Sequence, residues 1–216
     1  MAHIHLEDGS FTLFWVCVWW AIALILICAA LIWVRSAKKI DNRRITLAAF
    51  CTAAAFAVFQ VSIPVFGGVH LNLTPLIGIL IGPAFGSFVV LITNILSAAI
   101  GHGGWGMIGA NLLVNIIEVI VAYALFRVLK KIFPGTFVRG GIATLAGLFC
   151  GNLAMIAIIV VSGIQGISQT PSQILGGLIL VAGVNMGFAF VEAGISAMII
   201  SYIIQIRPDM LESERS

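Results

Sequence analysis

The chain has 216 residues, of which 61% are hydrophobic and only 9% are charged. Soluble domains are about 25% charged, and a chain of this length cannot bury so much apolar surface in one core, so the composition excludes an ordinary soluble domain and predicts an integral membrane protein. The net charge of +3 includes no basic run long enough for nucleic acid, and no GxxxxGK[ST] loop is present to hydrolyse ATP.

The apolar segments predict an all-α fold with seven transmembrane helices. A helix needs about 20 apolar residues to cross a bilayer. The apolar stretch at 71–100 is too long for one helix, so we expect a break at Gly82-Pro83, and its short first half could instead be re-entrant. The expected spans are residues 13–34, 45–65, 73–81, 84–100, 107–129, 142–161 and 174–206.

The positions of lysine and arginine support this count. The eleven Lys and Arg residues fall at 35–44, at 127–139 and near the C-terminus. Four crossings between the first two clusters place both on one side of the membrane, and the positive-inside rule makes that side cytoplasmic. The odd number of spans then puts the N-terminus outside and the C-terminus in the cytoplasm. The tail before the first span lacks the basic region of a signal peptide, so we expect it to be retained.

All four histidines fall on the predicted outer side. His3 and His5 lie in the tail, His70 follows the second span, and His102 precedes the fifth. No Lys or Arg stands beside them, so they can form an outward-facing cluster of neutral nitrogen ligands.

The first three residues, Met1-Ala2-His3, can chelate a metal by themselves. A histidine at the third position lets one peptide supply the terminal amine, two deprotonated amides and the imidazole. This planar array of nitrogens suits Ni(II) or Cu(II) better than tetrahedral Zn(II). Because the motif is short, a free tail with an accidental histidine is the alternative.

His70 and His102 are the other candidates. Glycines precede His70 at 67–68 and flank His102 on both sides, which lets the backbone approach closely. We expect His70 to be a ligand and His102 to hold a ligand or a loop in place. The alternative for each is a capping or hydrogen-bonding role near the lipid head groups.

Three features together resemble the substrate-binding membrane subunits of nickel and cobalt importers (the NikM/CbiM type). They are the N-terminal histidine motif, the VHLNLT segment at 69–74, and the GHGG…GAN residues within 101–111. The resemblance covers nearly the whole chain and implies an extra N-terminal helix with the tail (1–40) before a six-helix core (41–216). It also implies that the N-terminus folds into the core and binds the metal in a plane with a core histidine. We expect His5, His102 and Asn111 to support that site.

The resemblance also implies the biological setting. Such proteins are S components of energy-coupling-factor importers in the prokaryotic cell (inner) membrane. They take up Ni(II) or Co(II) and work with a transmembrane coupling (T) subunit and cytoplasmic ATPase subunits. A small accessory membrane subunit is a further expected partner, and no organic cofactor is expected.

Ala2 departs from the family pattern, in which the chain typically begins Met-His. If Met1 is retained, the tail can fill all four planar positions and leave His70 outside the square or axial. If Met1 is removed, Ala2-His3 restores the family spacing. We expect Met1, Ala2, His3 and His70 to bind the metal.

Ala49, Ala53 and Ala57 are four residues apart and share one helix face. Small residues let helices approach closely in lipid, so packing within the chain is the default interpretation. Similar alanine motifs in the first core helix of S components face the coupling subunit, so a subunit interface is the alternative.

Glu118 and Glu192 fall inside expected spans, where a carboxylate costs several kcal/mol and usually has a function. Asn111 and Asn115 share a face with Glu118, which predicts a polar network, whereas Glu192 could pair with Asn185 along its own helix. An ion relay and stabilisation of the folded-in tail both stay open, and neither glutamate is assigned as a metal ligand.

The remaining features weigh against other functions. The four cysteines lie in apolar runs without CxxC spacing and are expected to be small buried residues (Cys17, Cys28, Cys51 and Cys150). HExxH is absent, so an intramembrane metalloenzyme is disfavoured and the chain is not expected to be an enzyme. A stand-alone metal channel or secondary carrier is the alternative function, although no inverted repeat is evident. Co(II) uptake for cobalamin synthesis is the alternative to nickel uptake.

Overall fold

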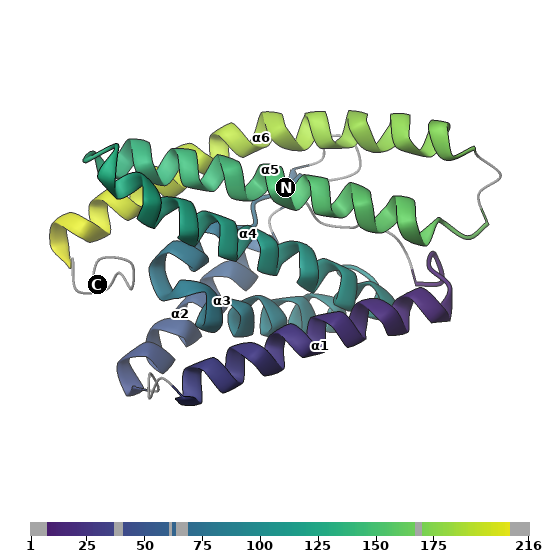
Figure 1. Ribbon diagram of the computed structural model, residues 1–216, viewed down its shortest axis with the longest axis horizontal. Helices are drawn as coiled ribbons and strands as arrows, with labels where there is room; N and C mark the ends of the chain where they lie inside the picture. The colour runs from purple at the N-terminus through teal and green to yellow at the C-terminus, as the bar shows by residue number, and fades with distance from the viewer. Residues whose placement is uncertain (1–7, 37–40, 61, 64–68, 167–169, 208–216) are drawn as a thin grey trace.

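The computed structural model describes residues 8–36, 41–60, 62–63, 69–166 and 170–207, with the backbone alone for residues 62, 63, 69 and 171. The described residues form six α-helices: α1 (Leu13–Ser36), α2 (Asn42–Phe59), α3 (Thr74–Ala99), α4 (Ile108–Val128), α5 (Thr136–Ser162) and α6 (Pro171–Ile206). Short 3-10 turns flank α4 at Trp105–Met107 and Leu129–Lys131, and strands β1 (Ser62–Ile63) and β2 (Val69–His70) pair antiparallel. In Figure 1, α3 and α4 lie between the α5–α6 pair and the α1–α2 pair.

Five of these helical segments are long and apolar enough to cross a membrane: α1, α3, α4 with its flanking turns, α5 and α6. This supports the predicted helical membrane protein, but the described residues form six helices and five such segments, so the predicted seven spans are not confirmed. The helix α2 has 18 residues and begins with the polar Asn42-Arg43-Arg44, so it does not reach the same length of apolar chain.

The helix α3 is broken at Gly82, as the sequence predicts. Gly82 has φ 82° and ψ 171°, a conformation that L-residues with a side chain rarely adopt, and Pro83 follows it. A Cβ atom built on Gly86 would lie 3.8 Å from the Cα of Gly78, whereas residues eight apart in a straight helix are about 12 Å apart. The chain therefore folds back on itself at Gly82. The arm at 74–81 is about 12 Å long, too short to cross a bilayer alone.

Two predicted helix boundaries are wrong. The second span was expected to reach residue 65, but α2 ends at Phe59 because the chain turns at Gln60 into β1, which pairs with β2. The sixth span was expected to begin at 142, but α5 begins at Thr136. Gly140 lies within this helix, and the absence of a side chain there lets Ile200 of α6 approach, its Cδ1 lying 3.0 Å from where a Cβ would be.

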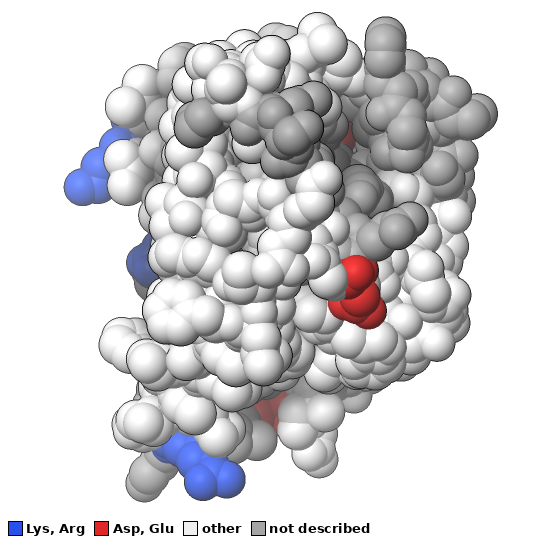
Figure 2. All heavy atoms as spheres, turned by 90° about the vertical axis from the view of Figure 1, so that its right-hand side faces the viewer, with Lys and Arg blue, Asp and Glu red and all other residues white. Residues whose placement is uncertain are grey.

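The bundle has two chemically different ends. The described Lys and Arg residues lie where α1, α4 and α6 end and where α2 and α5 begin, and we call this the basic end (Arg35, Arg43, Arg44, Arg127, Lys130, Lys131, Arg139 and Arg207). His70 and His102 lie at the opposite end, the histidine end, beside the C-terminus of α2. Figure 2 views the histidine end, where Lys and Arg appear only at the margin. The predicted separation of these histidines from the basic residues is confirmed.

Burial is very uneven among the helices. About 67% of the most apolar part of α3 is buried inside the protein, against 11% for both α1 and α6. Backbones touch where α3 meets α4, because a Cβ at Gly78 would collide with the Val119 carbonyl oxygen. Of the four cysteines expected to be buried, Cys51 is buried and Cys150 is partly buried. The expectation is wrong for Cys17 and Cys28, which are exposed on α1.

Candidate metal centre

His70 and His102 lie in contact at the histidine end. Their ring centroids are 4.4 Å apart and the rings are nearly perpendicular, at 86°. Phe59, the last residue of α2, packs against both, with centroid distances of 5.4 Å to His70 and 5.0 Å to His102. His70 is buried, and its backbone is held by the pairing of β2 with Ser62 of β1. The structure thus brings together two histidines that are 32 positions apart in the sequence.

The position of His102 follows from how α3 ends. Gly101 has φ 81° and donates its N–H to Ala98 O, and the His102 N–H bonds to Ser97 O at 2.9 Å. This is the Schellman arrangement, in which a left-handed glycine closes the helix and the next residue turns back over it. Gly103, with φ 92°, then reverses the chain again. The glycines around His102 therefore fix the direction of its side chain toward His70.

Partial burial lowers the pKa of His102 below its usual value. Burial disfavours the charged imidazolium. His102 is therefore neutral at physiological pH, which is the form that can accept a hydrogen bond or bind a metal.

Asp8 fixes the end of the N-terminal tail onto the same loop. Its carboxylate accepts hydrogen bonds from the backbone N–H groups of Trp105 (3.1 Å) and Gly106 (2.8 Å). A Cβ on Gly104 would collide with this carboxylate, so the absence of a side chain there lets Asp8 approach the loop closely. Two further features hold the segment between Asp8 and α1. The Gln165 N–H donates to Ser10 O at 2.8 Å, and the Phe11 side chain is buried. Asp8 is therefore bound to Trp105, which follows His102 by three residues in the same loop.

Removal of the Asp8 carboxylate tests whether the tail must be held. We expect Asp8→Ala to weaken Ni(II) binding about 10- to 100-fold, the usual effect of losing a group that positions metal ligands. Isothermal titration of the purified protein measures this. Gly104→Ala should give the same loss without altering Asp8, whereas Asp41→Ala, which removes an exposed carboxylate at the start of α2, should change nothing. Equal Ni(II) affinity in the wild type and all three variants would show that the contact between Asp8 and the loop does not matter for metal binding.

A buried polar network holds the segment that follows His70. The Asn72 side-chain amide donates to Glu118 Oε2 (3.2 Å) and to Asn115 Oδ1 (3.3 Å). The Glu192 carboxylate accepts the backbone N–H groups of Asn72 (3.4 Å) and Leu73 (2.9 Å). Both glutamates are fully buried. The network thus joins α4 and α6 to the extended chain between β2 and α3.

The network agrees with one sequence prediction and overturns another. Asn115 and Glu118 do belong to one polar network, through Asn72. The predicted pairing of Glu192 with Asn185 is wrong, because Asn185 donates to Asn152 Oδ1 of α5 at 3.2 Å while Glu192 holds the backbone near Leu73. Leu73 needs this support because its φ of 51° is left-handed, which costs a non-glycine residue about 1–2 kcal/mol.

The other predicted site residues are placed as follows. Met1, Ala2, His3 and His5 lie outside the described residues. Asn111 is buried in the first turn of α4. The alanine face of α2 points outward: it consists of three exposed residues, Ala49, Ala53 and Ala57. Packing of this face against the part of the chain that the structure describes is therefore excluded.

Sequence reasoning missed Asp8 and Asn72. Asp8 belongs to no recognisable motif, and its partners are backbone N–H groups almost 100 residues away. The available signal was glycine at both 104 and 106, which marks a loop that another segment approaches closely.

Comparisons with known proteins identify the family. Residues 5–210 match the family model described as "Cobalt uptake substrate-specific transmembrane region" (CbiM). A candidate metal transport protein of Haloquadratum walsbyi is 26% identical over 212 residues, covering 96% of this chain and 93% of its own. A candidate fused nickel transport protein, NikMN, of Archaeoglobus fulgidus is 30% identical over 186 residues, which cover 83% of this chain and 60% of that longer protein.

The fold also matches a solved structure. The crystal structure of a truncated transition metal transporter superposes with a TM-score of 0.82 at 19% identity, covering 94% of this chain and 99% of that one. The family match spans all six described helices, and the structure has the corresponding fold. The chain therefore belongs to the CbiM family and is a membrane component of cobalt and nickel transport.

Proposed function

We propose that this protein is the S component of an energy-coupling-factor importer and captures Ni(II) from outside the cell with its N-terminal tail. The observation that supports the proposal is the hydrogen-bonded attachment of Asp8 to the loop that carries His102, which contacts His70. The seven residues before Asp8 span at most about 25 Å, so the terminal amine is within reach of His70.

The proposed ligands are nitrogens of Met1, Ala2, His3 and His70. The described residues contain no group of three or more His, Cys, Asp or Glu side chains that could hold a metal ion. Donors from the tail are therefore a natural complement to His70, and planar nitrogen ligation favours Ni(II) over Co(II). The family match begins at His5 and leaves residues 1–4 outside it, so His5 competes with His3 as the imidazole of the tail.

The energy for uptake would come from partner subunits. We infer that the histidine end faces outward and the basic end faces the cytoplasm, in agreement with the positive-inside rule. The exposed alanine face of α2 then offers a smooth surface for a transmembrane coupling subunit, which in turn would engage cytoplasmic ATPases.

Metal uptake in reconstituted membranes tests this function against a stand-alone carrier. We expect ⁶³Ni accumulation only when the coupling subunit, the ATPases and ATP are all present. Strong ATP-independent uptake by the chain alone would support the carrier instead. Parallel assays with Co(II) determine which cation is preferred.

A bulky residue on the alanine face tests the docking surface. We expect Ala53→Trp to reduce co-purification of the coupling subunit at least tenfold, because an indole at this position prevents close helix packing. Ni(II) affinity of the isolated chain should be unchanged. The matched control is Ala21→Trp, at an exposed position on α1. If both variants assemble normally, the coupling subunit docks elsewhere.

A further inference from the structure

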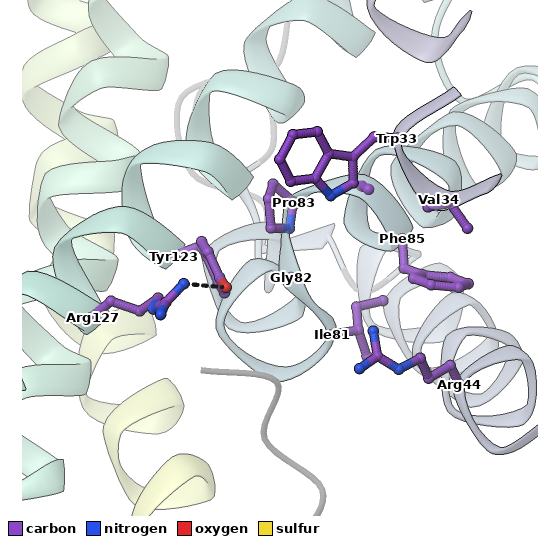
Figure 3. A pocket seen from close by; sticks show the side chains of 10 residues that line it. Trp33, Val34, Arg44, Ile81, Gly82, Pro83, Phe85, Tyr123 and Arg127 are labelled. Carbon is purple, nitrogen blue, oxygen red and sulfur yellow. Dashed lines mark hydrogen bonds between the residues drawn. The ribbon is translucent and has the colours of Figure 1, made fainter. Parts of the chain in front are cut away.

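A small cavity lies at the basic end, far from the metal centre. It has a volume of about 170 Å³ and is bounded by the end of α1, the start of α2, the Gly82 break in α3 and the end of α4. Trp33, Ile81 and Phe85 give it an apolar wall. Figure 3 shows Arg44 and Arg127 on opposite sides of the Gly82 turn.

The polar rim of this cavity is built for an anion. Two arginines and the Tyr123 hydroxyl line it, and none of the described residues that line it is acidic. The Arg127 guanidinium is oriented by a hydrogen bond to Tyr123 Oη (3.2 Å) and lies 5.6 Å from the centre of that ring. Arginine binds phosphate oxygens through a planar fork of donors, so the rim that Arg44 and Arg127 line suits a phosphate group.

The apolar side of the cavity opens toward lipid. Trp33, which is 64% exposed, also lines a second, open hollow of about 520 Å³ along α1 with Ala29, Ile32 and Ser36. That hollow is apolar and runs along a helix surface that faces the bilayer. A molecule with a phosphate at the arginines can therefore lay an acyl chain against Trp33 and Ile32.

We propose that this cavity is a binding site for an anionic phospholipid, with the head-group phosphate at the rim that Arg44 and Arg127 line and one acyl chain along α1. Basic pockets between transmembrane helices on the cytoplasmic side bind anionic head groups. A soluble phosphate would use the arginines but not the apolar hollow, and an acidic segment of a partner protein would not need it either. The bound lipid would brace α1, α2 and α4 around the turn at Gly82.

Lipid retention on the intact protein tests this site. The full chain is reconstituted with phosphatidylglycerol or phosphatidylcholine, delipidated in mild detergent, and measured by native mass spectrometry. We expect phosphatidylglycerol to be retained and the double variant Arg44→Gln/Arg127→Gln to retain it at least about tenfold less. The matched control is Arg43→Gln/Lys130→Gln, which removes the same charge from residues outside the cavity and should retain the lipid.

Further arms separate the alternatives. Trp33→Ala should weaken lipid retention while both arginines remain, which also covers the case in which the double variant fails to fold. Millimolar inorganic phosphate should not displace the lipid, and displacement would identify a free-anion site instead. Equal retention by the wild type and both double variants would overturn the proposal. So would loss of coupling-subunit assembly with unchanged lipid retention, which would assign the arginines to a protein contact. Ni(II) titration of each variant should be unchanged, so this test is independent of the metal site.

Discussion

Acetylation of the N-terminal amine is expected to abolish tight Ni(II) binding. In the proposed site the amine is a ligand, and it also anchors the chelate rings that allow the following amides to be deprotonated. Loss of groups that only position a ligand costs 10- to 100-fold in metal affinity, so loss of the amine itself should cost at least about 100-fold. Isothermal titration, with an absorption spectrum that reports planar Ni(II), measures the effect. Unchanged affinity would rule out the chelate.

Single histidine variants divide the site further. His70→Ala should weaken binding by a similar factor if His70 completes the plane, and much less if it is axial. Comparison of His3→Ala with His5→Ala decides which tail imidazole binds, because the family match begins at His5 whereas the terminal chelate requires His3. His102→Gln keeps a hydrogen-bonding side chain, so a smaller loss is expected there.

Replacement of Glu192 by alanine is expected to destabilise the protein and the metal site together. The Glu192 carboxylate accepts two buried backbone N–H groups, those of Asn72 and Leu73. An unsatisfied buried donor costs about 1–3 kcal/mol, so the variant should lose roughly 2–6 kcal/mol, and Leu73 should relax from its left-handed conformation. Thermal unfolding in detergent should show a large fall in midpoint, and Ni(II) affinity should fall because His70 lies two residues before Asn72.

Two further variants make the Glu192 result specific. Glu192→Gln keeps one acceptor oxygen but turns its other group into a donor facing a backbone N–H, so an intermediate loss is expected. Ser196→Ala changes another fully buried polar residue one turn further along α6 and should affect neither property. If Glu192→Ala melts like the wild type and binds Ni(II) normally, the carboxylate does not hold this segment.

Hydropathy predicted the long helices because lipid selects for apolar length, and α1 begins at Leu13 as expected. The break at Gly82 was predictable because glycine followed by proline is a strong local signal. The end of α2 was not, because apolar residues recur after Phe59 at 61, 63 and 65, and it is the pairing of β1 with β2 that takes Ser62 and Ile63 out of the helix.

The candidate site was predictable only in part. The approach of His70 to His102 followed from placing both at one end of the bundle. The partner of Glu192 is 119 residues away in sequence, so no helical period could reveal it. Asp8 acts through backbone donors, which leave no pattern of side-chain types. Long-range contacts between a polar side chain and the backbone are the part of the site that a single sequence hides.

The unequal burial of the helices sets how freely each can change during evolution. The outer helices α1 and α6 mainly need to remain hydrophobic. A saturation mutagenesis screen should therefore accept most exchanges among Leu, Ile, Val and Phe at their exposed positions. The inner helices α3 and α4 are restricted by shape, since Gly78 touches the backbone of Val119 and Gly109 that of Trp20. Even alanine should be rejected at these two glycines. Substitutions should therefore be restricted mainly at the interior positions of this fold.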